Sequence, residues 1–582
     1  MEKLSLYLRA RVSAITMRTV VLRLIAAVAL VSLVSILCLP YSFKSEEFFT
    51  FIPFGLYFVF VVLAALLFLF LLPQRAEAPV VLGLLTAVFF LTNLASRDVL
   101  YALVSAAVVG GFVFYLAEEL PLPRIGRRTA ITLTAVLGSL LALFVGGLTI
   151  LKYLEYLTPN FDFGIFSQMY HYMAKTLVPY TTCERDMLLS HFAVHFSPIL
   201  YAALPLYAIF PHPATLLAVQ ALVVGSGVIP LYLLSRHLGL SERKTVGVIL
   251  LYVLHPTVIA NNFYYFHENC FLTALLLWLF LFVERDRPML VALFALLVMA
   301  VKEDAPVYIV FLGLYLLLRR GRRRMGGCLT AGALAYFLTV TALMKAYGQG
   351  VMTYRYENFL FGEESSLFAV VLNIVKNPAD AFHEMLDAGK LLFFLAMLVP
   401  LALLPLAVKK PERLLLLGPF ILVNLLSDYV YQYDIGFQYT YASVAFLFYL
   451  TVLNLAELDG RVAKRMLLTA MAASCLFFGA TNASRLGSVA EFVSSRDTTA
   501  TIREALATIP EEASVRASTF FVAPLSERDE IYEYVYSDEE TDYVVLDLRY
   551  GDEEMIRFLV SEDGYRRILY EEDVIVIYER IK

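Results

Sequence analysis

Long apolar runs separated by short polar segments dominate this chain. A bilayer-spanning helix needs about 20 mostly apolar residues, and many of the runs reach or approach that length. Hydrophobic residues make up 60% of the 582 and charged residues only 17%, which excludes an ordinary soluble enzyme. We therefore expect an all-α polytopic membrane protein with about 13 to 16 transmembrane helices. The candidate spans are 22–40, 51–72, 79–95, 99–117, 131–151, 214–235, 244–262, 270–284, 288–301, 305–319, 326–346, 390–408, 412–431, 437–456 and 464–482.

Some apolar segments do not fit a simple span. The segment 196–210 is short, contains Pro198 and Pro205, and has no basic loop after it, so we interpret it as a re-entrant or outer-leaflet helix. Irregular backbone at membrane depth is tolerated only against protein or a water-filled cavity. The runs 288–301 and 305–319 are also short, and they predict two half-helices that meet at a triplet of charged residues.

Short basic loops orient the spans, because cytoplasmic loops of membrane proteins are rich in Lys and Arg. Placing every basic loop inside leaves the other loops outside with consistent parity. The two largest predicted outer loops are 152–213 and 347–389, and we expect a multi-pass protein of the plasma membrane. The basic loops are 124–128, 236–244, 285–287, 319–324, 409–410 and 461–465.

The end of the chain has a different composition from the rest. Its charge density rises and its apolar runs shrink to strand length, which favours a small extracytoplasmic α/β domain. Residues 498–509 predict a helix and 543–549 a buried strand, and 565–570 with 574–578 predict a hairpin. The predicted domains are N-terminal transmembrane helices at 1–130, a transmembrane core at 131–484 and the α/β domain at 485–582.

Polar residues beside the spans are the candidates for function, because charges near hydrocarbon are costly and tend to be retained for a purpose. Asp162 follows the fifth span and lies among aromatic residues. Burial would raise its pKa, which suits a general base or a metal ligand. The alternative is that Asp162 caps a helix that starts at Phe163.

Two pairs of outer residues carry imidazoles. His191 and His195 are four residues apart, so on a helix they would share one face and could bind a metal or contact a phosphate. Interfacial packing against neighbouring phenylalanines is the alternative. His267 and Glu268 follow an aromatic run and form an acid/base or phosphate-handling pair, or else an ordinary loop rim.

The charged triplet Lys302, Glu303 and Asp304 is expected within membrane depth, where it needs partners or water. In the second large outer loop, Arg355 has the planar fork that suits a phosphate clamp, with a salt bridge to Glu357 as the alternative. If the loop assignment is right, these groups and the imidazoles all face outward and can line one cavity.

Several sequence blocks resemble a known family. The chain is similar to the prokaryotic membrane-protein family catalogued as domain of unknown function 2079, over roughly residues 150 to 550. In its tail block, Ala523 stands where the family pattern often has a histidine. The blocks are Asn160-Phe-Asp-Phe-Gly-Ile-Phe-Ser-Gln168, His195-Phe-Ser-Pro-Ile-Leu200, Leu216-Leu-Ala-Val-Gln220 and Ala517-Ser-Thr-Phe-Phe-Val-Ala-Pro-Leu-Ser-Glu-Arg528.

That family resembles, more distantly, the GT-C membrane glycosyltransferases, which use polyprenyl-phosphate sugar donors. The resemblance implies a GT-C-like core in which Asp162 matches the acid of the first large outer loop. Glu268 and Glu303 would then join it in catalysis. His191, His195, His267, Lys302, Asp304 and Arg355 would bind the substrate. A divalent metal is a possible cofactor, held by Asp162, His191 and His195.

The expected partners are therefore membrane lipids and a lipid-linked sugar donor of the cell envelope. Nucleic acid is not expected as a partner, because the basic residues gather in short loops and the acidic residues in the C-terminal tail. Two other functions stay open. A transporter or lipid flippase would use the broken helix near 302–304 as its site. A ligand-binding ectodomain on a membrane base is the third alternative.

Overall fold

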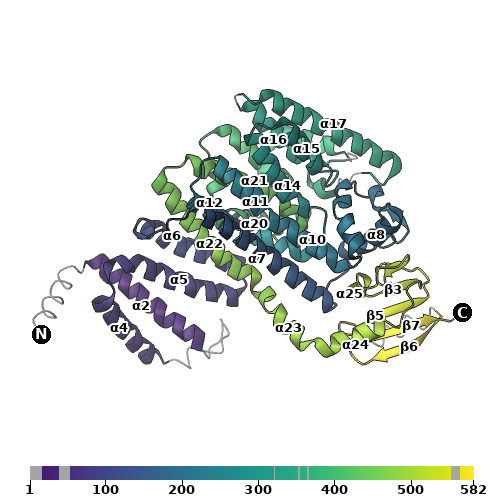
Figure 1. The fold of residues 1–582 in the computed structure, drawn as a ribbon, viewed down its shortest axis with the longest axis horizontal. Coiled ribbons are helices and arrows are strands. Elements are labelled where there is room, and N and C mark those ends of the chain that lie inside the picture. Colours follow the sequence, from purple (N-terminus) through teal and green to yellow (C-terminus); the bar gives the residue numbers. More distant parts are fainter. Residues whose placement is uncertain are drawn as a thin grey trace, which may run out of the picture.

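A computed structural model describes residues 16–38, 53–319, 321–350, 354–362, 366–551 and 564–581. It confirms a mostly helical membrane protein with a small C-terminal sheet (Figure 1). Within the described part of the chain, nine helices are long and apolar enough to cross a bilayer, or ten if one bent pair counts as a span. Further predicted spans occur as apolar helices of 10–17 residues. Which side of the membrane each loop faces stays a prediction.

The first helices pack beside the rest of the chain rather than inside it. Helix α2 packs against α4 and α5, and α6 packs against α22, which links this group to the core (Figure 1). Arg23 of α2 forms a buried ion pair with Glu77 of α5 at 2.6 Å, so the two apolar helices are held in register. These helices are α2 (Met17–Cys38), α4 (Phe54–Leu71), α5 (Gln74–Ser96) and α6 (Val99–Leu116).

The core is built around α21 (Tyr441–Glu457). In the apolar stretch of this segment, 94% of the residues are buried. A helix that is apolar on all sides needs neighbours all round, and the Phe280 ring of α14 stacks on Tyr449 of α21 at 4.4 Å. The other core helices are α7 (Arg127–Leu154), α8 (Phe163–Thr176), α9 (Leu204–Ile209), α10 (Pro213–Ser226), α11 (Val228–His237), α12 (Glu242–Leu254), α13 (Pro256–Ala260), α14 (Cys270–Glu284), α15 (Pro288–Met299), α16 (Pro306–Leu318), α17 (Arg323–Tyr347), α18 (Leu367–Lys376), α19 (Pro378–Glu384), α20 (Ala388–Leu398) and α22 (Gly460–Leu486).

Several predicted spans are interrupted in the structure. The expected half-helices are present as α15 and α16, with the charged triplet between them. The segment 196–210 forms only a short 3-10 helix and the six-residue α9 and does not span. Helix α12 and the helical segment Pro256–Tyr264, which begins with α13, bend by 51° at the break between them. The prediction of a regular span at 412–431 is wrong, because the chain forms a 3-10 helix at Pro411–Leu417 and a π-helix at Phe420–Leu425.

The basic loops meet one another at one end of the helices. Lys464 donates to the carbonyls of Glu118 and Leu120, which joins the first turns of α22 to the segment after α6. Arg413 and Lys410 both pair with Glu457, at 2.6 and 2.8 Å. These contacts agree with the predicted placement of the basic loops on a common side.

The C-terminal region forms a five-stranded sheet in the order β4-β3-β5-β7-β6. Strand β3 pairs in parallel with β4 and β5, and β7 pairs antiparallel with β5 and β6. The predicted helix, buried strand and hairpin are all confirmed. The elements are α23 (Ser488–Ser494), α24 (Arg496–Leu506), β3 (Val515–Ala517), α25 (Thr519–Val522), β4 (Ile531–Glu533), β5 (Tyr543–Asp547), β6 (Tyr565–Glu571) and β7 (Ile575–Arg580). The other described strands, β1 (Tyr180–Thr181) and β2 (Leu189–Ser190), pair within the segment between α8 and α9.

Candidate functional site

Asp162 lies at the start of α8 and points toward residues from distant segments. Its Oδ2 is 3.6 Å from Nε2 of His267 and accepts a hydrogen bond of 3.4 Å from Gln438. Asp162 occupies the N-cap position of a helix that starts at Phe163, as the helix-cap alternative expected, but its carboxylate makes no capping hydrogen bond to α8. The side chain keeps 31% of its surface accessible. Even so, burial by the surrounding protein raises the pKa of Asp162, and Lys302 offsets part of that effect.

Behind Asp162, a buried row of charges joins two loops. His267 Nδ1 is 3.1 Å from Glu268, and the Lys302 ammonium is 3.0 Å from the other oxygen of Glu268. The side chain of Glu268 is fully buried and that of Lys302 is 2% exposed. The structure therefore brings these residues together, as the sequence predicted, and that they line one cavity stays a prediction. Glu268 is closed off from solvent, and its two oxygens face His267 and Lys302.

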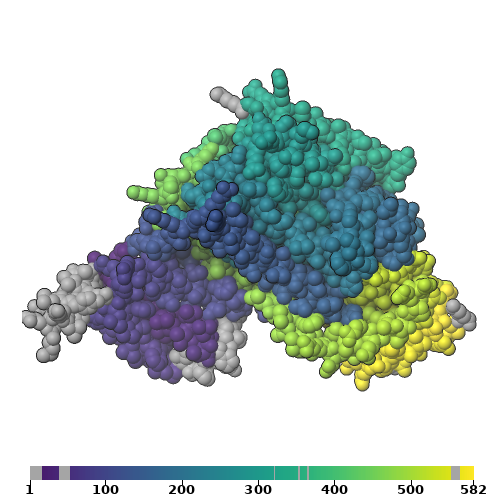
Figure 2. Space-filling model, viewed as in Figure 1, coloured from purple at the N-terminus to yellow at the C-terminus, as the bar shows by residue number. Residues whose placement is uncertain are grey.

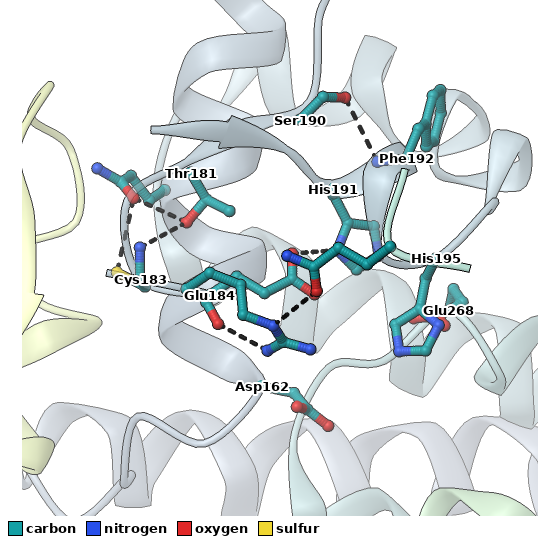
Figure 3. A network of polar contacts seen from close by, with 12 residues as sticks. Asp162, Thr181, Cys183, Glu184, Ser190, His191, Phe192, His195 and Glu268 are labelled. Carbon is teal, nitrogen blue, oxygen red and sulfur yellow. Dashed lines mark hydrogen bonds and ion pairs between the residues drawn. The ribbon is translucent and has the colours of Figure 1, made fainter. Parts of the chain in front are cut away.

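The other two histidines each have a carboxylate of their own. His195 Nδ1 lies 2.8 Å from Glu303, whose second oxygen accepts from the Phe196 amide at 3.1 Å. His191 Nδ1 lies 2.9 Å from Glu184. The two histidines are not on an α-helix, because His191–Ala193 is a 3-10 turn, but their rings still lie 5.6 Å apart. Figure 3 shows both imidazoles with Glu184, Glu268 and Asp162.

Phe166 of α8 joins these imidazoles into one cluster. Its ring meets both His191 and His267 edge-on, with ring centroids 5.4 Å away in each case. One helix turn thus carries Asp162 at its start and an aromatic ring that separates two imidazole–carboxylate pairs. The sequence block 160–168, which contains Asp162, therefore also supplies the ring that packs between His191 and His267.

Ion pairing sets the charge of the His191–Glu184 pair. Burial disfavours the protonated imidazole, but Glu184 outweighs it and raises the pKa of His191. Burial likewise opposes ionisation of Glu184, but His191 outweighs it and lowers the pKa of that carboxyl. The pair is therefore ionised over a wider pH range than either group alone. His191 Nε2 is buried and has no hydrogen-bond partner among the described residues.

Arg355 lies in a setting of tyrosines. Its guanidinium is 4.9 Å from the Tyr439 ring, 5.5 Å from Tyr429 and 6.0 Å from Tyr354. Cations are attracted to aromatic faces, and the attraction grows as water is excluded. Asp304 is close enough to Arg355 to interact with it electrostatically. Arg355 therefore belongs to the same polar region as the charged triplet.

The suggested metal set does not form. Among the described residues, no group of three or more His, Cys, Asp or Glu side chains is arranged to hold a metal ion. Asp162, His191 and His195 do lie in one region (Figure 3), but each imidazole directs its Nδ1 to a carboxylate of its own.

Sequence reasoning missed several contributors. Glu184 holds His191 and Gln438 holds Asp162, yet neither stands in a recognisable motif. The one available signal for Glu184 was its place seven residues before a histidine in the same outer loop. A separate cavity of about 930 Å³ lies at the basic end of the helices, beside Arg319 and Arg413. The polar cluster is not part of that cavity.

Comparison with known proteins agrees with the blocks around Asp162 and His195. A family profile described as a predicted membrane protein, domain of unknown function 2079, matches residues 152–567. The chain belongs to this family. The matched region contains every residue of the polar cluster, whereas the described helices α2, α4, α5 and α6 and most of α7 precede it. No curated protein matches the chain. The likeness of the family to GT-C transferases stays a prediction.

Proposed function

We propose that this protein is a GT-C-like glycosyltransferase that takes a sugar from a polyprenyl-phosphate donor at the outer face of the membrane. The observation that carries the proposal is the solvent exposure of the Asp162 carboxylate. It is the most exposed carboxylate among those that contact the three imidazoles, at 31% against at most 6% for Glu184, Glu268 and Glu303. It is the acid that an acceptor can reach.

Asp162 acts as the general base. A base works best when its pKa approaches the ambient pH, and burial moves the pKa of Asp162 upward. Gln438 holds the carboxylate oxygen that also faces His267. The carboxylate would take the proton of the acceptor hydroxyl. At the same time the hydroxyl oxygen would attack the anomeric carbon of the sugar, and the polyprenyl phosphate would leave.

Exposed aromatic rings beside Asp162 suit a sugar. Phe161, 58% exposed, stacks on Tyr264 with ring centroids 6.1 Å apart. Tyr264 packs against Phe437 at 4.5 Å, and Phe437 packs against Tyr431 at 4.3 Å. Faces of sugar rings are apolar and stack on aromatic side chains. This row of rings leads from Asp162 toward the tyrosines around Arg355, which would meet the donor phosphate.

A transporter is the second candidate, and two observations favour it. Carboxylates outnumber fixed cations in the cluster, and the triplet Lys302, Glu303 and Asp304 sits at a break between two short helices. Discontinuous helices with charges at mid-depth are typical of transporters. However, Lys302 and Glu303 are already paired within the protein. Their pairing favours a structural role over an exchangeable ion site.

The experiment uses the full chain in lipid nanodiscs with radiolabelled undecaprenyl-phosphate hexoses and pentoses. Asp162→Asn should lower release of undecaprenyl phosphate by at least about a hundredfold, the usual contribution of a general base. Asp434→Asn is the matched control, because Asp434 is exposed and its Oδ1 contact to the Gly436 amide survives the change. Full activity in Asp162→Asn rejects the proposal. Movement of labelled substrate across proteoliposomes without cleavage identifies the transporter instead.

A further inference from the structure

The C-terminal sheet packs against the segment that carries Asp162. Figure 1 shows β3 and α25 beside α8, and Figure 2 shows the C-terminal region in contact with the segment that contains α8. The two partners are more than 350 residues apart in the chain. A domain attached only by its linker would not need such contacts.

The closest contacts fall on the turn that presents Asp162. The Asn160 side chain donates to Glu533 of β4 at 2.6 Å, and its backbone amide donates to the Thr519 hydroxyl at 2.9 Å. The next residue, Phe161, has a φ of 27°, in the left-handed region that costs energy for a bulky side chain. This strained turn ends one residue before Asp162, and two contacts from the C-terminal domain hold it.

The turn has no room to relax. A Cβ on Gly164 would lie 1.8 Å from Oδ1 of Asn160 and 2.9 Å from the side chain of Val522 in α25. The C-terminal domain therefore packs directly on the first turn of α8. Glycine is required here because any side chain would push Asn160 away from Glu533.

Further contacts continue along α8 and the outer loop. Gln168 donates to the Asp529 carbonyl at 3.1 Å, and Lys175 pairs with the Asp529 carboxylate at 3.2 Å. Thr182 donates to the Ile531 carbonyl at 2.6 Å and accepts from the Ile531 amide at 3.2 Å. The Thr182 hydroxyl thus binds both the carbonyl and the amide of Ile531. These two bonds fix the position of β4 relative to this segment.

Before the turn, Arg549 closes the interface. It donates to the carbonyl of Tyr156 at 2.7 Å and to that of Glu155 at 3.3 Å, just after α7 ends. Asp547 holds the guanidinium at 2.6 Å. Carbonyls at a helix C-terminus are short of partners and carry partial negative charge, so the half-buried guanidinium of Arg549 is favourable there.

We propose that the C-terminal domain is an integral part of the candidate site, and that Glu533 is a positioning residue that fixes Asp162 through Asn160. Glu533 does not touch the substrate. It accepts the Asn160 amide, which keeps the strained turn closed and directs Asp162 toward His267 and Gln438. The activity arm of the test rests on the proposed function, whereas the structural arm does not.

The structural arm measures amide hydrogen exchange of a peptide over 158–168 in the full chain in nanodiscs. Glu533→Ala removes the acceptor and should speed exchange at the Asn160 and Gly164 amides by at least about tenfold. Glu533→Gln keeps an oxygen acceptor for Asn160 and should stay close to wild type. Glu512→Ala, an exposed acid of the same domain, is the control. Exchange in Glu533→Ala equal to wild type overturns the proposal.

A second variant guards against loss of folding in the first. Thr519→Val removes only the hydroxyl that accepts from the Asn160 backbone, and the same amides should exchange faster. If both variants leave the turn protected, the domain does not hold it and the inference fails.

The activity arm measures sugar transfer as in the test of Asp162. Glu533→Ala should lower kcat with little change in KM, and Glu533→Gln should restore most of it, because a positioned base is lost rather than a binding group. An unchanged kcat in Glu533→Ala contradicts positioning. If the exchange results hold while wild type transfers no sugar from any donor, the proposed function fails and the structural role of the domain stands.

Discussion

Replacing Lys302 by methionine tests whether the polar cluster is held by its buried ion pair. The Lys302 ammonium lies 3.0 Å from Glu268, and both side chains are shielded from solvent, at 2% and 0% exposed. Methionine fills similar space but leaves the carboxylate without its cation. Among the described residues, neither oxygen of Glu268 has a hydrogen-bond partner beyond its ion pairs to Lys302 and His267. Breaking a buried pair in this way costs about 3–5 kcal/mol.

The two partners should differ in sensitivity. Lys302 also interacts with Glu303 and Asp304, so Glu268→Gln leaves the ammonium with acidic neighbours. We therefore expect Lys302→Met to lower the free energy of unfolding by about 3–5 kcal/mol and Glu268→Gln by clearly less. The double variant removes both charges and should recover part of the loss. The resulting coupling energy is about 2 kcal/mol.

The assay is denaturant unfolding of the full chain in mild detergent, run as a double-mutant cycle. Lys345→Met is the control, because Lys345 is exposed on α17 and its loss should change stability by less than about 0.5 kcal/mol. A Lys302→Met variant as stable as this control refutes the reasoning. So does a double variant that is less stable than Lys302→Met, because the charges would then not compensate each other.

Two further predictions concern the outer loop. Gly164→Ala should lose about 1–3 kcal/mol and lower the thermal midpoint, because its Cβ would overlap Asn160, whereas Gly111→Ala meets nothing within 4 Å and should not. The His191–Glu184 pair should stabilise the loop most between the ordinary pKa values of 4.5 and 6.5. Its contribution is lost as pH rises through the raised pKa of His191, or falls through the lowered pKa of Glu184. Thermal unfolding from about pH 5 to pH 9 should show this slope in wild type and a flatter profile in Glu184→Gln; equal slopes would contradict it.

Much of the fold could be predicted because it follows from local patterns. Apolar run length identified the membrane helices, and the two short runs around Lys302 correctly predicted a break there. The acidic turn between 565–570 and 574–578 correctly predicted a hairpin. The segment 412–431 failed for a physical reason. Its composition is apolar enough for a span, but tertiary packing sets its backbone as 3-10 and π turns, which hydropathy does not record.

The polar cluster was only half predictable. A charged residue near hydrocarbon is costly unless it is paired or functional. Glu268, Lys302 and Glu303 could therefore be selected as candidates from the sequence. Their partners could not be assigned, because contact depends on tertiary packing between segments far apart. Gln438 reaches Asp162 across 276 residues, and Glu533 reaches Asn160 across 373. No periodicity within either segment carries that information.

The pairing pattern explains why a membrane protein would keep so many buried charges in one place. Three imidazoles each take one carboxylate, at 2.9 Å for His191, 2.8 Å for His195 and 3.1 Å for His267. A carboxylate that holds a histidine fixes its ring orientation and its proton, and so cannot easily serve as a base. Asp162 lies outside these three pairs, 3.6 Å from His267 and with 31% of its side chain open to solvent. In the proposed function, the paired acids would therefore orient the histidines, and Asp162 would carry the reaction chemistry.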